Sequence, residues 1–238
     1  MKLYGHPRSS CTRKVLLALA ETGQRAELVR IELAQGDHTR PAHLARHPFG
    51  KVPVLEEGDF VLYESVAILR YLAARRPLAA LLPHDPHGCA RLEQWLSVEA
   101  AYLAPALWKL MSQLELAPMY GVAPDLAEVE EARRELGHAL DVLDRALGAG
   151  SFLVGGRFSL AEIVLFPALQ ALMELGQGDL CRLRPRLFAW WERCGARPSF
   201  RGVLALGEEE PEWARLAEPA QGVRTRPSSV GTSGAPSA

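Results

Sequence analysis

The hydrophobic pattern of the chain changes its period at one proline-rich stretch, PLAALLPHDPHG, at residues 77–88. Before this stretch, alternating apolar residues typical of strands are mixed with helical patterns, whereas after it apolar residues recur at helical spacing. Such a change predicts two domains. We expect a small α/β domain over residues 1–77, a linker over 78–88, an all-helical domain over 89–218, and a disordered Ser-, Gly- and Pro-rich tail over 219–238.

The first domain is predicted to form a small mixed sheet with flanking helices. Strands are expected at residues 2–4, 27–33, 54–55 and 60–63, the last two joined as a hairpin by the turn sequence EEGD. Helices are expected at residues 12–22, stopped by Gly23, and at 65–76. The inward face of the second helix is predicted to carry Ala67, Ile68, Tyr71 and Leu72.

The second domain shows long helical stripes of apolar residues. One stripe runs over residues 92–114 and includes Glu99 and Tyr102, and another runs over 129–147. In FSLAEI, Ser159 and Glu162 have the spacing of a capping box, and a further helix is expected near Pro185.

Composition argues against several classes of partner. The 27 basic and 28 acidic residues give a net charge of -1, so no overall field attracts nucleic acid or an anionic membrane. No apolar run is long enough to span a bilayer, and the first residues do not resemble a signal peptide. The four cysteines form no C-x-x-C pair, and His84 with His87 is typical of solvated histidines, so we expect no metal site and a cytoplasmic protein with reduced thiols.

Three polar side chains, Ser9, Ser10 and Cys11, stand directly before or at the start of the first predicted helix. A serine here can cap the helix, or its hydroxyl can donate a hydrogen bond to a ligand. A cysteine here can have a lowered pKa and form a mixed disulfide. The residues alone leave these roles open.

Four motifs in order resemble the glutathione S-transferase family, and its phi class in particular. They are GHPRSSCTRKV, GDH, HPFGKVP and ESVAI, beginning at Gly5, Gly36, His47 and Glu64, and the resemblance extends over residues 1–206. The triplet SSC is also similar to the zeta class of glutathione-dependent isomerases. The resemblance implies a thioredoxin-like first domain, an all-helical second domain, glutathione as co-substrate without a metal, and a homodimer.

The resemblance assigns Ser9 as the hydrogen-bond donor to the glutathione thiolate. An ordinary thiol with a pKa of about 8.5 is only about 3% ionised at pH 7, and lowering that pKa by two units takes about 2.7 kcal/mol. One hydroxyl hydrogen bond to an anion supplies about 1.5–3 kcal/mol, and a helix N-terminus adds about 0.3–2 kcal/mol. Ser10 and Cys11 remain the alternatives, and Arg13 is either a source of positive potential or a surface charge.

The same resemblance implies residues that bind the rest of glutathione. Val52, followed by a cis Pro53, would pair with the cysteinyl backbone, and Glu64 with Ser65 would hold the γ-glutamyl end. His38 would meet the glycyl carboxylate. The family's usual lysine and glutamine are replaced here by Thr39 and Lys51, with Arg40 as another possible source of positive charge.

The acceptor pocket is expected between the domains, where Met111, Leu116, Met119 and Tyr120 are candidates for its lining. Phe49 either inserts into a partner subunit or is an ordinary core residue. The predicted function is conjugation of glutathione to hydrophobic electrophiles, with peroxide reduction as a side activity. The alternatives are a zeta-like isomerase, a thiol transferase that uses Cys11, and a non-catalytic ligand-binding protein.

Overall fold

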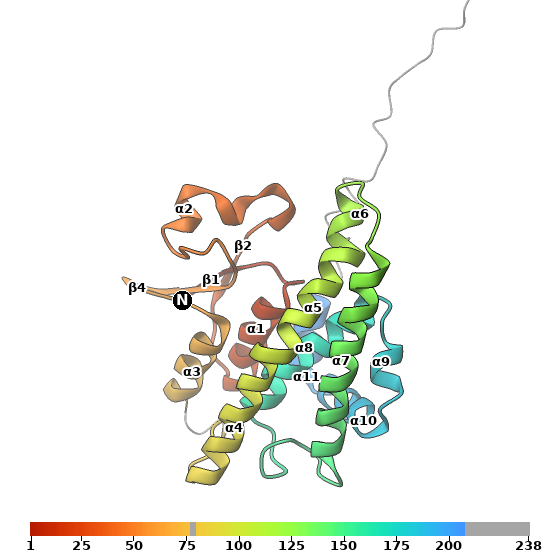
Figure 1. Cartoon of the computed structure of the whole chain (residues 1–238). Coiled ribbons are helices and arrows are strands. Elements are labelled where there is room, and N and C mark those ends of the chain that lie inside the picture. Colours follow the sequence, from red (N-terminus) through yellow and green to blue (C-terminus); the bar gives the residue numbers. More distant parts are fainter. Residues whose placement is uncertain (77–79, 208–238) are drawn as a thin grey trace, which may run out of the picture.

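The computed structural model describes residues 1–76 and 80–207, and its first part contains the predicted mixed sheet. The elements follow the order β1 (Lys2–Gly5), α1 (Ser10–Thr22), β2 (Glu27–Arg30), β3 (Val54–Glu57), β4 (Phe60–Tyr63) and α3 (Ser65–Arg75). Two short 3-10 turns, η1 (Leu33–Gln35) and η2 (Asp37–Thr39), and the one-turn helix α2 (Pro41–Leu44) connect β2 to β3. In Figure 1 this connection lies above the sheet, whereas α1 and α3 lie below it.

The sheet has the strand order β2-β1-β3-β4. β1 is parallel to β2 and antiparallel to β3, with Tyr4 opposite Val54, and Val54 is also opposite Tyr63 of β4. The ends of β1, β2 and β4 therefore lie at the same edge of the sheet as the start of β3. This edge gathers the segments that carry most of the predicted site residues.

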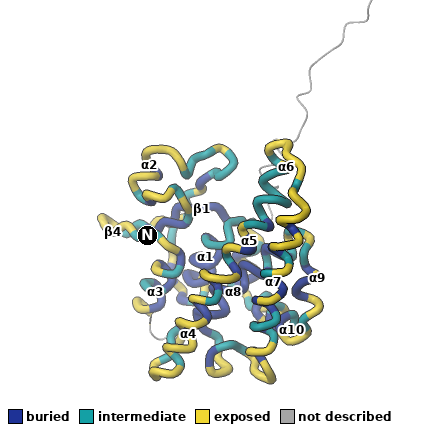
Figure 2. Tube along the Cα trace, in the orientation of Figure 1, coloured by how far each residue is buried: buried dark blue, intermediate teal, exposed yellow. Residues whose placement is uncertain are grey.

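The second part of the described chain is helical. A long rod is built from α4 (Pro86–Val98), α5 (Ala104–Met111) and α6 (Ala117–Met119), joined by the π-helical segments η4 (Glu99–Leu103) and η5 (Ser112–Leu116). It is followed by α7 (Leu126–Leu147), α8 (Leu160–Glu174), α9 (Asp179–Arg182), α10 (Pro185–Gly195) and α11 (Pro198–Ala205). α8 is buried along most of its length and forms the centre of this domain (Figure 2).

Helix α1 joins the two domains. It contacts α3 of its own domain on one side and α8 and α11 of the helical domain on the other. Buried Lys14 pairs with buried Glu99 at 2.8 Å, buried Arg13 pairs with Glu174 at 2.8 Å, and Glu21 pairs with Arg197 at 2.6 Å. The apolar core is continuous between the domains, since Val15 and Ala18 belong to the same cluster as Leu165.

Local signals in the sequence predicted several elements correctly. The capping box of α8 forms as expected, because Glu162 accepts from the Ser159 backbone N–H at 2.9 Å and Ser159 Oγ accepts from Ala161 N–H. The predicted apolar stripe of α7 is buried throughout. Gly23 ends α1 in the left-handed conformation, with φ of 63°.

The two π-helical segments were not predicted, and they change which residues of the long rod face inward. A π turn contains one residue more than an α turn, so each segment rotates the following apolar stripe around the helix axis. Leu103 and Leu107 are buried, but Tyr102 is 63% exposed although the regular spacing placed it on the inner face. Glu99, in the same stripe, is buried because it pairs with Lys14.

Smaller differences concern the ends and faces of elements. β2 ends at Arg30 rather than residue 33, since Glu32 N–H bonds the Asp37 side chain and a 3-10 turn follows. Ala67 is exposed, because the buried stripe of α3 runs through Ser65, Ile68, Leu69 and Leu72, and Ala67 lies on the opposite face. α4 begins at Pro86, within the expected linker. The predictions for residues 77–79 and 208–238, including the tail over 219–238, lie outside the described residues.

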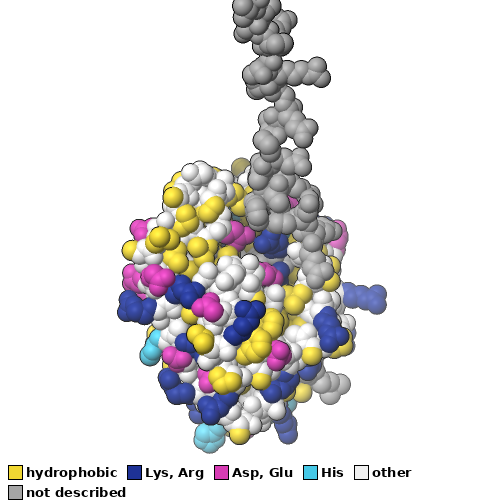
Figure 3. All heavy atoms as spheres, turned by 90° about the vertical axis from the view of Figure 1, so that its right-hand side faces the viewer, with side chains coloured by type: hydrophobic (Ala, Val, Ile, Leu, Met, Phe, Trp, Pro, Cys, Tyr) yellow, Lys and Arg dark blue, Asp and Glu magenta, His cyan; other side chains and the backbone are white. Residues whose placement is uncertain are grey.

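The described surface carries charges of both signs, and the cysteines form no disulfide bonds. Over residues 1–76 and 80–207, no helix is long and apolar enough to cross a membrane. Basic and acidic side chains are interspersed on the face shown in Figure 3. All four cysteines are free thiols, and burial raises the pKa of Cys181 to about 12.

Candidate functional site

Residues 6–9, between β1 and α1, form a tightly held loop at the sheet edge. Ser9 N–H bonds the His6 carbonyl at 2.9 Å, and Arg8 N–H bonds His6 Nδ1 at 3.3 Å. Burial lowers the pKa of His6, although Glu32, 3.6 Å from its Nε2, partly offsets this. From α1, Arg13 Nε donates to the Pro7 carbonyl at 2.9 Å, so both ends of the loop are fixed.

Ser9 is the N-cap of α1. Its Oγ accepts a hydrogen bond from Thr12 N–H at 3.3 Å, while Thr12 itself packs closely against Gly5, where an added Cβ would lie 2.6 Å from the Thr12 Oγ1. Because the Ser9 oxygen acts as acceptor in the cap, its hydrogen remains free to donate to a ligand. Capping and ligand binding are therefore compatible roles for one hydroxyl.

Ser10 and Cys11 occupy the first two helical positions and are both partly exposed. Cys11 is therefore not the buried apolar residue that was one possibility for it. Neither side chain has a hydrogen-bond partner within residues 1–76 and 80–207.

The cations that surround the start of α1 are mostly neutralised. Arg13 is 3% exposed and makes hydrogen bonds of 2.8 and 2.9 Å to Glu174, so it is neither a surface charge nor a free source of positive potential. Lys14 is paired with Glu99. Besides Arg8, which makes a long contact of 3.5 Å to Glu115, the helix N-terminus and Ser9 are therefore the features here that could stabilise an anion.

The segment before β3 has the backbone that the sequence predicted. The Val52–Pro53 peptide bond is cis, Pro53 is buried, and Val52 is partly exposed. Among the described residues, no hydrogen bond involves the N–H or C=O of Val52, so both are available to an extended ligand. The ring of buried His43 forms a hydrogen bond of 2.8 Å with the Lys51 carbonyl and so holds the backbone before Val52 in place. The Lys51 side chain is exposed.

Glu64 and Ser65 lie where β4 meets α3. Glu64 is the N-cap residue of α3 and has φ of 69° and ψ of 113°, a backbone conformation that a residue with a side chain rarely adopts. Such local strain is commonly found at binding sites. Glu64 is exposed, and Ser65 is 8% exposed at the first position of the helix, so a carboxylate and helix N–H groups are presented together.

The loop that contains His38 and Thr39 packs beside the Lys51 segment. A Cβ on Gly50, which has φ of 58°, would lie 3.1 Å from the His38 carbonyl, so this close approach requires glycine. The Nδ1 atom of His38 is buried without a hydrogen-bond partner in the described structure. Thr39 Oγ1 bonds the Gly36 carbonyl, and Arg40 pairs with Asp37 at 2.9 Å. Arg40 is therefore already engaged by an acid.

The candidate acceptor residues lie on the end of the long rod. Met111 ends α5, Leu116 ends η5, Met119 ends α6, and all three are partly buried, whereas Tyr120 is 74% exposed. Glu115 of η5 lies 3.5 Å from Arg8, which places this end of the rod beside the 6–9 loop.

Phe49 is 71% exposed, so its interpretation as a core residue was wrong. Its ring makes edge contacts with His47 and Tyr63, with ring centroids 6.2 and 6.3 Å apart. The sequence analysis named His47 only as the first residue of HPFGKVP and missed the supporting roles of His43 and His47, although their spacing of one helical turn was a possible signal.

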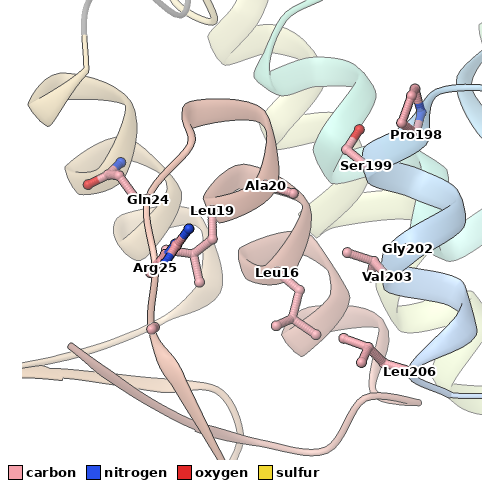
Figure 4. A pocket seen from close by; sticks show the side chains of 11 residues that line it. Leu16, Leu19, Ala20, Gln24, Arg25, Pro198, Ser199, Gly202, Val203 and Leu206 are labelled. Carbon is pink, nitrogen blue, oxygen red and sulfur yellow. The ribbon is translucent and has the colours of Figure 1, made fainter.

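A separate groove of about 500 Å³ lies between α1 and α11. Figure 4 shows its lining, which includes Leu16, Leu19, Arg25, Ser199 and Val203 and none of the predicted site residues. In the part of the chain that the structure describes, no group of three or more His, Cys, Asp or Glu side chains could hold a metal ion.

Comparison with known families identifies both domains. Residues 1–74 match the model of the glutathione S-transferase N-terminal domain, and residues 101–198 match that of the glutathione S-transferase C-terminal domain. The chain is 38% identical over 206 residues to Glutathione S-transferase F13 of Arabidopsis thaliana, covering 85% of this chain and 94% of that protein.

Two solved structures show the same architecture. Glutathione transferase F7 from Populus trichocarpa has a TM-score of 0.82 and 34% identity, covering 87% of this chain and 99% of its own. Glutathione S-transferase I from maize, in complex with an atrazine glutathione conjugate, has a TM-score of 0.81 and 32% identity, covering 88% and 99%. The described helices and strands thus follow a fold that these proteins share.

Proposed function

Because this chain belongs to the glutathione S-transferase family, we propose that it conjugates glutathione to hydrophobic electrophiles, with Ser9 as the hydrogen-bond donor to the glutathione thiolate. The observation that carries this proposal is the geometry of Ser9. Its oxygen accepts a hydrogen bond from Thr12 N–H at the N-terminus of α1. The hydroxyl hydrogen is therefore free to point toward an acceptor atom of a bound ligand.

Ionisation of glutathione is the step that Ser9 would assist. A hydroxyl donor and a helix N-terminus each favour the thiolate over the thiol, and together they supply about 2–5 kcal/mol. This amount lowers the pKa of a thiol by roughly two units, so that most bound glutathione is ionised at neutral pH. The thiolate then attacks the electrophilic atom, a C–S bond forms, and the leaving group departs with the electron pair of the bond that breaks.

The other predicted residues would orient the tripeptide. The N–H and C=O of Val52 would pair with the cysteinyl residue as a neighbouring strand does. Ser65 and the start of α3 would bind the γ-glutamyl carboxylate, and Glu64 its ammonium group. His38, Thr39 and Lys51, from two loops that approach each other at Gly50, would meet the glycyl carboxylate.

The test compares the three residues that compete for the role. Ser9→Ala, Ser10→Ala and Cys11→Ser are assayed with glutathione and 1-chloro-2,4-dinitrobenzene, and glutathione binding is measured by calorimetry. We expect Ser9→Ala to lower kcat/KM by about 10- to 100-fold while it still binds glutathione, because one charge-assisted hydrogen bond is lost. Unchanged turnover in Ser9→Ala, with activity lost in Cys11→Ser, would instead identify a thiol transferase.

We also propose a homodimer in the cytoplasm. The ring of Phe49 is exposed, and its contacts with the rings of His47 and Tyr63 restrict its orientation. An exposed, oriented aromatic ring of this kind can insert into a pocket of a second subunit. Sedimentation of wild type and Phe49→Ser tests this assembly, with Phe60→Ser as a control at another exposed aromatic residue. A wild-type monomer at micromolar concentration would contradict the dimer, and cell fractionation tests the compartment.

A further inference from the structure

Arg8 is the residue directly before Ser9, and its side chain reaches across from the first domain to the helical domain. Its Nη2 lies 3.5 Å from Glu115 of η5, and both side chains are only about a quarter exposed, at 27% and 25%. Consecutive Cα atoms are about 3.8 Å apart, so the side chains of Arg8 and Ser9 leave the backbone from the same short loop.

The Arg8 contact differs from the other cation contacts of this region. Arg13 bonds both carboxylate oxygens of Glu174 and the Pro7 carbonyl, and it is 3% exposed. Within residues 1–76 and 80–207, the Arg8 guanidinium makes one long side-chain contact, and a guanidinium carries five N–H donors. Toward the described residues most of its donors are therefore open, and exchange of one long, partly exposed ion pair for a new partner costs little.

We propose that Arg8 selects acceptor substrates that carry an anionic group, such as a carboxylate, with Glu115 as the competing internal anion. This inference rests on the proposed transferase function, because it describes the acceptor side of the same site. The acceptor would lie between the 6–9 loop and η5, with its reactive carbon at the thiolate held by Ser9 and its anionic group on the Arg8 guanidinium. A planar guanidinium binds a carboxylate through two parallel hydrogen bonds.

Among the described neighbours of Ser9, Arg8 is the cation with the weakest internal partner. Lys14 and Arg13 are held by Glu99 and Glu174 at 2.8 Å, and burial lowers the pKa of His6, which favours its neutral ring. A Cβ on Gly207, in the turn that follows α11, would lie 3.5 Å from Arg8 Cγ, so this turn limits the space around the Arg8 stem.

The experiment uses two acceptors that differ only in charge, 4-chloro-3,5-dinitrobenzoate and its neutral amide. In both, the glutathione thiolate attacks the carbon that bears chlorine, a C–S bond forms, and chloride leaves with the electrons of the broken C–Cl bond. The readout is the ratio of kcat/KM for the benzoate to that for the amide, each corrected for its uncatalysed rate. A ratio cancels losses that affect both acceptors equally.

We expect Arg8→Gln to lower this ratio by about tenfold or more, because the charge and both hydrogen bonds are lost, and Arg8→Lys, which keeps the charge without the planar fork, to give an intermediate ratio. Glu115→Gln should raise the ratio, because the competing carboxylate is removed. Lys109→Gln is the matched control, since it removes one positive charge from the rod at a lysine paired with Glu135 of α7, and it should leave the ratio unchanged.

Equal losses on both acceptors in Arg8→Gln would overturn the inference and assign Arg8 a structural role. A raised KM for glutathione with an unchanged ratio would also overturn it, because Arg8 would then bind the co-substrate. Failure of the wild type to conjugate even the neutral amide would count against the proposed function itself. The two hypotheses are therefore tested separately.

Discussion

Lys14 Nζ lies 2.8 Å from a carboxylate oxygen of Glu99, and both side chains are almost completely buried between the two domains. Removal of one partner leaves the other charge buried without compensation. We expect Lys14→Met or Glu99→Leu alone to lower the free energy of unfolding by about 3–5 kcal/mol, and the double variant to recover much of this loss. Urea denaturation of the four proteins gives the coupling energy. Additive losses in the double variant would show that the pair is not a unit.

The two roles of Ser9 can be separated by Ser9→Asp. Aspartate caps helices as well as serine does, so stability should change by less than about 1 kcal/mol. A carboxylate cannot donate a hydrogen bond and repels a thiolate, so conjugation should fall below that of Ser9→Ala. Thermal melts and turnover with a chloronitrobenzene measure the two effects. Activity close to wild type in Ser9→Asp would mean that capping alone is the role of this residue.

Glu162 connects several elements of the helical domain. Burial raises its pKa despite the hydrogen bonds from Leu153 and Ser159 that favour the charged form. Glu162→Ala removes the acceptor for these N–H groups, and we expect a loss of about 3 kcal/mol in the free energy of unfolding. Glu192→Ala, at a solvent-facing position of α10, is the control and should cost less than about 0.5 kcal/mol. Similar midpoints for both variants in urea would contradict this role.

Acid should weaken the folded state through its buried histidines. Burial lowers the pKa of His6 and His47, so the unfolded chain binds more protons than the folded one once the pH falls below about 6.5. The stability from these neutral rings is complete above that pH and is lost as the pH falls through their folded pKa values. Each histidine contributes at most about 1.4 kcal/mol per pH unit.

Urea titrations at about pH 7.5 and about pH 5.5 measure this sensitivity. His47→Leu should reduce the difference between the two pH values, whereas His138→Leu, on the exposed face of α7, should leave it unchanged. If the free energy of unfolding of His47→Leu differs between the two pH values as much as that of the wild type does, His47 does not cause the acid sensitivity.

Short-range signals made much of the fold predictable. The hairpin, the Gly23 stop and the Ser159–Glu162 capping box each depend on residues within a few positions, and each formed as expected. The π segments depend on how the long rod packs against α1 and α7, so the regular spacing placed Tyr102 wrongly. The one hint was Glu99, an acid within an apolar stripe, which required a buried cation.

The candidate site was predictable as a list of segments but not as an arrangement. The cis bond at Pro53 and the position of Ser9 at the start of α1 agree with the motifs. The carboxylate partners of Arg13 and Arg8 are more than one hundred positions away in the sequence, so no local pattern could identify them. His43, which holds the Lys51 carbonyl, likewise acts through a contact that only the folded loop creates.

The Arg13 side chain holds the Pro7 carbonyl of the Ser9 loop with one nitrogen and the Glu174 carboxylate of the helical domain with another. Turnover and the fluorescence of Trp190 and Trp191 in α10, followed through the same urea titration, report on the loop and on the helical domain. If the domains separate before the helices melt, turnover should fall first. The rate of glutathione conjugation would then report how strongly the two domains are held together, and the protein would lose activity at a lower urea concentration than the one that unfolds its helices.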